Sequence, residues 1–291
     1  TRLVTSPTQF IVNLHTHTDY CDGKGAPEDF IKKAIELNFK YLGFSAHAPL
    51  PFQYNWSMNP EKLDDYCEHI LSLKQSQKGK IKILHGFEID FLEGLNFPSL
   101  SEIQIQQADY LICSIHFLKD PASKAASPKF YEIDGTYAQF MLALKGHQYS
   151  LKKILRNYLE ATEQMLTTPI LPNRVKIIGH VDKIVLNAQR LPEFEGMSDW
   201  FYQELADKLI QHVSHYQYVE INTRALYKKG LSQPYPRYGL LEMLAEKHIP
   251  LIINSDAHHP SELWGGYKET MTRLETLTNV NIKSLDYKWP K

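Results

Sequence analysis

Seven short apolar runs recur along this 291-residue chain, and amphipathic stretches separate most of them. The runs are nearly continuous rather than strictly alternating, which is typical of strands buried on both faces of a parallel sheet. Strands that alternate with helices predict βαβ units. The predicted strands are residues 10–15, 41–47, 81–90, 109–116, 175–180, 216–222 and 249–256, and the predicted helices are residues 26–38, 60–77, 151–166, 198–215 and 237–247.

The arrangement of these strands is predicted to be a closed or nearly closed α/β barrel. The chain contains no Gly-x-Gly-x-x-Gly fingerprint and no phosphate-binding loop motif, which argues against an open, doubly wound sheet. Its length would also allow two small domains, but no linker or repeat divides it, so we expect one domain over residues 1–291. Residues 117–150 break the strand–helix pattern and are predicted to form an insertion at the barrel mouth.

Charge and composition exclude several classes of partner. The net charge is −1, and basic and acidic residues are interspersed without a basic stripe, so no nucleic-acid partner is expected. No apolar run is long enough to cross a bilayer, and no secretory signal is apparent, so no membrane partner is expected. The three cysteines, Cys21, Cys67 and Cys113, are too few and too scattered for a disulfide framework. A cytoplasmic protein is expected, and its oligomeric state is left open.

Metal-binding residue types stand at the ends of the predicted strands. In parallel barrels these carboxyl ends converge on one face, where active sites are built. Buried titratable groups cost free energy unless they are paired or coordinated, so a metal cluster explains this pattern better than isolated buried histidines do. The strand-end residues are His15, His47, Glu88, His116, His180 and Asp256.

The first and last strands each end in a pair of such residues. His15-Thr16-His17 and Asp256-Ala257-His258 place two potential ligands two residues apart, on the same side of an extended chain. The first and last strands are neighbours in a closed barrel, so the two pairs should face each other. Imidazoles and carboxylates without a thiolate suit Zn, Fe or Mn.

As an ordered set, these motifs make the chain resemble the polymerase-and-histidinol-phosphatase (PHP) superfamily. The motifs are His-x-His, Ser-Ala-His-Ala-Pro at 45–49, Gly-Phe-Glu at 86–88, Ser-Ile-His at 114–116, Gly-His-Val-Asp at 179–182 and Asn-Ser-Asp-Ala-His at 254–258. Within the superfamily, the chain resembles the stand-alone histidinol-phosphate phosphatases of histidine biosynthesis. The resemblance implies a distorted, TIM-like (β/α)7 barrel that holds three divalent metal ions. Relatives commonly have Asp where this chain has Ala46, a departure that removes no expected ligand.

The resemblance also implies a ligand set. His15, His17, Glu88 and Asp256 would hold the first ion, and Glu88 would bridge to a second. The second ion would be completed by His116 and His180, and the third would be held by Asp22, His47 and His258.

The expected reaction is hydrolysis of L-histidinol phosphate to L-histidinol and phosphate, with Asp256 and His258 as the catalytic residues that move the proton. Phosphate-binding cations should lie just past strand ends or on first helical turns. The candidates are Lys183, Arg190, Arg224 and Arg156, of which Arg156 is preferred. Phe52 or Phe117 could stack on the imidazole of the substrate, and Asp90 or Glu93 could bind its amine.

Three other functions agree less well with the sequence. A nuclease-type PHP enzyme acting on nucleotides or other phosphate monoesters is disfavoured because basic patches and a polymerase domain are lacking. Metallo-amidohydrolases share the His-x-His start, but they usually bridge two metals with a carboxylated Lys, and here the bridging position holds Glu88. A metal-bound docking domain without catalytic activity would be expected to have lost some of the metal-binding residues. All nine expected positions hold a residue that can bind a metal.

Overall fold

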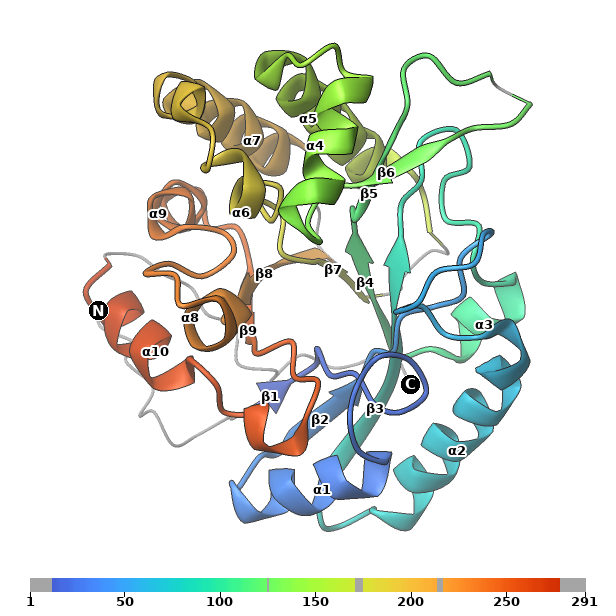
Figure 1. Cartoon of the computed structure of the whole chain (residues 1–291). Coiled ribbons are helices and arrows are strands. Elements are labelled where there is room, and N and C mark those ends of the chain that lie inside the picture. The colour runs from blue at the N-terminus through green and yellow to red at the C-terminus, as the bar shows by residue number, and fades with distance from the viewer. Residues whose placement is uncertain (1–11, 125, 171–174, 214–216, 278–291) are drawn as a thin grey trace.

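Seven parallel strands form one continuous sheet in the order β1-β2-β3-β4-β7-β8-β9. The computed structural model describes residues 12–124, 126–170, 175–213 and 217–277. Figure 1 shows the strands as a ring surrounded by helices. All seven predicted strands are confirmed, and only their predicted residues 10, 11 and 216 lie outside the described ranges. The strands are β1 Val12–Asn13, β2 Tyr41–Phe44, β3 Lys82–Asp90, β4 Tyr110–Ser114, β7 Val175–Ile178, β8 Gln217–Asn222 and β9 Leu251–Asn254.

The ring closes between the first and last strands, just beyond their ends. Thr16 and Ala257 form a parallel bridge. The amide of His17 donates to the carbonyl of Ala257 at 2.8 Å, and the amide of Ala257 donates to the carbonyl of His15 at 3.0 Å. The backbone therefore brings the His15–His17 and Asp256–His258 segments side by side, as the barrel prediction requires.

Helices cover the outside of the ring (Figure 1). The five predicted helices are confirmed as α1, α2, α5, α7 and α9, and residues 214 and 215 of the predicted helix 198–215 lie outside the described ranges. In α1, Pro27 occupies the first turn together with Glu28 and Asp29, residue types that favour a helix N-terminus. The helices are α1 Pro27–Glu36, α2 Leu63–Ser76, α3 Glu102–Gln107, α4 Tyr137–Gly146, α5 Leu151–Thr167, α6 Val185–Ala188, α7 Ser198–His212, α8 Arg224–Lys229, α9 Tyr238–Glu246 and α10 Tyr267–Glu275, with short 3-10 helices at Pro60–Lys62, Pro192–Met197 and Pro260–Glu262.

The barrel interior has an apolar floor beneath a polar mouth. Alternate residues of a strand point to the same face, so in β3 Leu84 belongs to the floor and Glu88, four residues on, reaches the mouth. The ring of Tyr110 lies so close to Gly43 and Gly86 that a side chain at either glycine would collide with it. This filled floor leaves the carboxyl ends of the strands as the place for a site.

Residues 117–150 contain two further strands and a helix. β5 Phe117–Lys119 and β6 Phe130–Glu132 form an antiparallel hairpin, which is followed by α4. The amide of Ile133 donates to the carbonyl of His116 at 3.0 Å, which fixes this segment to the end of β4. The assignment of the chain to one domain with an insertion stays a prediction. None of the helices in the described ranges has both the length and the apolar character needed to span a bilayer.

Candidate metal centre

The structure brings all nine predicted ligands together at the carboxyl ends of the strands. They fall into four overlapping groups, and within each group the potential ligand atoms lie within 4.8 Å of one another. The groups are His15, Glu88 and His180; His47, Glu88 and His116; His15, His17 and Asp256; and His17, Asp22, His47 and His258. Residues separated by more than 240 positions in the sequence thus share one site because the barrel closes.

Glu88 lies at the centre of this cluster. Its Oε1 is 2.9 Å from Nε2 of His180 and 3.4 Å from Nε2 of His116. Its Oε2 is 3.0 Å from Nε2 of His15, 3.3 Å from Nε2 of His17 and 3.2 Å from Nδ1 of His47. The two oxygens of one carboxylate therefore face two sets of imidazoles, which is the geometry that a bridging ligand needs.

Two buried carboxylates outside the nine residues are hydrogen-bonded to histidines of the cluster. Glu220 Oε1 lies 2.6 Å from Nδ1 of His15, and Asp90 Oδ1 lies 2.7 Å from Nδ1 of His116. Each carboxylate fixes the Nδ1–H tautomer and directs Nε2 of its histidine at Glu88. Glu220 also accepts the amide of His180 at 2.9 Å, so it holds two of the predicted ligands.

Sequence reasoning missed Glu220 and gave Asp90 a different role. The available signal for Glu220 was a carboxylate inside the apolar run Tyr-Val-Glu-Ile-Asn of β8, at an interior-facing position. Asp90 was expected to bind the substrate amine, and the structure pairs it with His116 instead. Ala46 is buried in the core on the helix side of the sheet and is not part of the cluster.

Orphaned polar atoms show that the cluster fits a metal ion. Among the described residues, four buried atoms of the cluster have no hydrogen-bond partner: Nε2 of His17, Oδ1 of Asp22, Nδ1 of His47 and Oδ1 of Asp256. Leaving such atoms unpaired away from water costs free energy, and coordination to a cation would remove that cost. The donor set of imidazoles and carboxylates is one that Zn, Fe or Mn accepts.

The electrostatics of the cluster also suit metal binding. Burial alone would raise the pKa of Glu88, but the surrounding imidazoles of His15, His47 and His116 hold it well below its usual range. Burial lowers the pKa of His47, His180 and His258, which favours their neutral form. Neighbouring carboxylates raise the pKa of His15 to about 10 and that of His116 to about 9, and they also raise that of His17, so a bound cation would displace protons from these three rings. An ionised carboxylate and neutral imidazoles are the forms that ligate a cation.

Of the four predicted phosphate-binding cations, Lys183 and Arg224 lie at the cluster. Lys183 Nζ is 3.1 Å from Oδ2 of Asp134, a buried carboxylate that itself lies 3.8 Å from Nε2 of His116. Arg224 Nη1 donates to the carbonyl of Asp256 at 2.9 Å and pairs with Glu262 at 3.2 Å, which braces the loop after β9.

The other two cations lie farther out. Arg190 stacks over the ring of Tyr137 at 3.8 Å, and Arg156 is exposed on α5. Within the described ranges, no hydrogen bond or ion pair joins either guanidinium to the nine residues.

Three aromatic side chains, Tyr54, Trp56 and Phe117, form what we call the aromatic wall of the mouth. The centroid of the Trp56 ring lies 4.5 Å from that of His47 and 5.0 Å from that of His116, and the ring stacks on Phe117. Glu132 fixes the wall by accepting from Nε1 of Trp56 at 3.0 Å and from the hydroxyl of Tyr54 at 2.5 Å. Phe117, one of the two predicted stacking residues, is part of the wall, and Phe52 packs behind it. Trp56 was missed.

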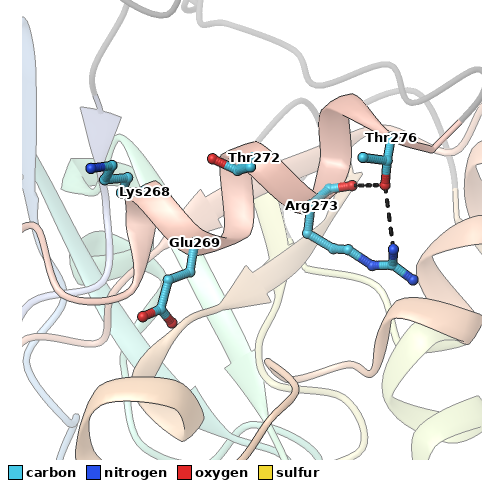
Figure 2. A pocket seen from close by; sticks show the side chains of 5 residues that line it. All are labelled: Lys268, Glu269, Thr272, Arg273 and Thr276. Carbon is cyan, nitrogen blue, oxygen red and sulfur yellow. Dashed lines mark hydrogen bonds between the residues drawn. The ribbon is translucent and has the colours of Figure 1, made fainter.

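A surface hollow elsewhere on the molecule lacks this chemistry. It runs along the outer helix α10, and its lining side chains all come from that helix or the residue after it (Figure 2). Arg273 and Thr276 are hydrogen-bonded to each other there, the hydroxyl of Thr276 donating to the Arg273 carbonyl at 2.6 Å. The full lining is Lys268, Glu269, Thr272, Arg273 and Thr276. Without a histidine or a carboxylate cluster, this hollow is not a candidate active site.

Comparison with known families agrees with the geometry. The family model described as the PHP domain matches residues 13–224, a span that contains seven of the nine cluster residues. The chain belongs to the PHP domain family. The PHP resemblance inferred from the motifs is therefore confirmed.

Individual PHP relatives are similar over most of their length. A Deinococcus radiodurans protein named a probable histidinol-phosphatase is 25% identical over 263 residues, which cover 87% of this chain and 88% of the relative. The histidinol-phosphatase of Bacillus subtilis is 22% identical over 271 residues, which cover 89% of this chain and 97% of the relative.

Solved structures confirm the PHP-type barrel. A candidate histidinol phosphatase from Listeria monocytogenes superposes with a TM-score of 0.72 at 22% identity, covering 89% of this chain and 99% of the other. The histidinol phosphate phosphatase of Lactococcus lactis, solved with zinc, L-histidinol and phosphate, superposes with a TM-score of 0.65 at 21% identity, covering 94% of this chain and 95% of the other.

Proposed function

We propose that this PHP protein is a metal-dependent phosphatase that hydrolyses L-histidinol phosphate to L-histidinol and phosphate. The observation that carries the proposal is the convergence of nine buried or half-buried residues, among which five imidazoles face the two oxygens of Glu88. Both curated relatives, similar over more than four fifths of this chain, bear the name histidinol-phosphatase, one of them as a probable assignment.

The cluster has room in its ligand set for up to three ions. His15, His17, Glu88 and Asp256 would hold one, Glu88 with His116 and His180 a second, and Asp22, His47 and His258 a third. Bound divalent ions would supply an activated water and neutralise charge on the phosphoryl group. The role of Glu220 and Asp90 is to keep His15 and His116 oriented for this task.

Asp256 and His258 are proposed to transfer the proton of the attacking water toward the leaving alkoxide. Asp256 Oδ1 lies 3.5 Å from Nδ1 of His258, and Asn222 donates to the other carboxylate oxygen at 3.1 Å. The backbone of Asp256 is left-handed, with φ 54°, a costly conformation for a residue other than glycine. Such strain, held by Asn222 and Arg224, aims the carboxylate into the mouth, where it can receive a proton and pass it toward the leaving alkoxide.

The aromatic wall favours a substrate that carries an aromatic ring. Trp56 is half-buried and borders His47 and His116, so a planar ring attached to a phosphate held at the cluster could stack on it. The imidazole of histidinol phosphate is such a ring.

The test is a phosphate-release assay on the metal-loaded chain with L-histidinol phosphate and, separately, a single-stranded oligonucleotide. We expect turnover of histidinol phosphate to be faster by orders of magnitude. Glu88→Gln is the variant that tests the role of the metal centre. It should lose bound metal and turnover while keeping the circular dichroism spectrum of the folded protein. Faster hydrolysis of the oligonucleotide, or undiminished activity in Glu88→Gln, would overturn the assignment.

A further inference from the structure

Tyr235 lies at the carboxyl end of β8, beside the cluster, although no motif pointed to it. After α8 the chain returns to the end of β8, where the amide of Tyr235 donates to the carbonyl of Asn222 at 2.9 Å. The amide of Asn222 donates back to the carbonyl of Tyr235 at 2.6 Å. The side chain of Asn222 in turn donates to the predicted ligand Asp256. Asn222 therefore links the backbone of Tyr235 to the cluster.

The hydroxyl of Tyr235 is buried without a partner. The residue is 4% exposed, and its hydroxyl has no hydrogen-bond partner among the described residues. Buried tyrosine hydroxyls are nearly always hydrogen-bonded, so an unpartnered one calls for a ligand. Burial raises its pKa, which keeps it protonated and able to donate at neutral pH.

Four charged side chains act electrostatically on this hydroxyl, those of Lys183, Asp182, Asp134 and Asp256. Asp256 belongs to the cluster, and Asp134 and Lys183 adjoin it at His116. Asp182 instead accepts from Tyr202 of α7. Lys183 is charged, because Asp134 and Asp256 raise its pKa against the effect of burial.

We propose that the Tyr235 hydroxyl, together with Lys183 Nζ, donates to an oxygen of the substrate phosphoryl group. The proposal rests on the phosphatase function proposed above. A neutral O–H donor beside an ammonium is suited to an anionic oxygen, whereas the ammonium of Lys183 would repel the amine of the substrate.

The position of the aromatic wall agrees with this assignment. Trp56 follows β2, and β2 and β8 lie on opposite sides of the closed ring. The imidazole end of the substrate would therefore lie against Trp56, while the phosphoryl end extends toward Tyr235 on the β8 side of the mouth.

The test compares wild type, Tyr235→Phe and Lys183→Met as zinc-loaded full chains, with inorganic phosphate and L-histidinol as probes in titration calorimetry. Tyr235→Phe removes only an unpartnered hydroxyl, so we expect unchanged zinc content and thermal stability. A hydrogen bond to a charged group corresponds to roughly a tenfold change or more in affinity. Phosphate affinity should fall about that much in both variants, with a parallel rise in KM, while L-histidinol affinity stays within about twofold.

The matched control is Tyr131→Phe, which removes a hydroxyl bonded to Asp120 on the outer hairpin and should change neither affinity. Unaltered phosphate affinity in Tyr235→Phe, a wild type that binds no phosphate, or weakened L-histidinol binding instead would each refute the proposal. A wild type that binds phosphate through Tyr235 but releases none from histidinol phosphate would refute the proposed function alone.

Discussion

Glu220 lies outside the nine predicted ligands but orients two of them. Its carboxylate contacts the ring of His15 and the amide of His180, and it accepts a third hydrogen bond from Asn254 at 3.0 Å. Burial would raise the pKa of Glu220, but the imidazole of His15 holds it below its usual value, so Glu220 is ionised. An ionised partner on Nδ1 raises the basicity of Nε2, the atom that faces Glu88.

Glu220→Gln should therefore weaken metal binding while leaving the fold intact. Loss of the charge behind a metal-binding histidine typically costs about 10- to 100-fold in metal affinity. The measurement is competition for zinc against a coloured chelator. Glu163→Gln is the matched control, because Glu163 pairs with Lys208 and His212 on the helix surface, away from the site. Equal zinc affinity in Glu220→Gln and wild type would show that His15 needs no such partner.

Eight of the nine predicted ligands could be inferred from the residues alone, because each stands at a predicted strand end or two residues from another candidate, whereas Asp22 followed only from the resemblance to the PHP superfamily. Trp56 and Tyr235 could not be inferred, for a physical reason. Tyr235 lies thirteen positions after the end of β8 and reaches the mouth only because its backbone pairs with Asn222. Trp56 is placed by a hydrogen bond to Glu132, which lies on a different segment of the chain. Such contacts between distant segments leave no periodic pattern in the sequence.

At the scale of elements, the aromatic wall joins the loop after β2 to the β5–β6 hairpin. Phe117 begins β5 and Glu132 ends β6. Phe117 stacks on Trp56 of the loop after β2, and Glu132 accepts a hydrogen bond from the same residue. The hairpin was not predicted, because strands of three residues are too short to show alternation. Helices α3, α6 and α8 were missed for the same reason, since six, four and six residues give less than two turns. Helices α4 and α10 were also not predicted, although they have ten and nine residues.

Trp56→Ala should raise KM for L-histidinol phosphate about tenfold and change kcat little, because ring stacking contributes on the order of 1 kcal/mol beyond buried area. For ethanolamine phosphate, which has no ring, KM should hardly change. Steady-state kinetics on both substrates measures this difference. Trp56→Phe keeps a ring and should recover most of the loss. An equal rise in KM for both substrates would exclude stacking on Trp56.

At the scale of the whole molecule, barrel closure creates the site. Each strand carries its apolar residues to the floor and its polar end to the mouth, and the Thr16–Ala257 bridge joins the two ends of the sheet. The strands were predictable because their apolar runs are continuous, and closure followed from their number and from the absence of a dinucleotide fingerprint. Which cations reach the mouth was not predictable, because an exposed Arg156 and a mouth-facing Lys183 look alike in sequence.

The most direct test of the metal-centre assignment is phosphate release from L-histidinol phosphate by the chelator-stripped chain during titration with Zn²⁺ or Mn²⁺. We predict no turnover above background in the stripped chain and recovery that saturates after two or three ions have bound per chain. A stripped chain that elemental analysis shows to be free of Zn, Fe and Mn, yet that retains its full rate, would contradict the account.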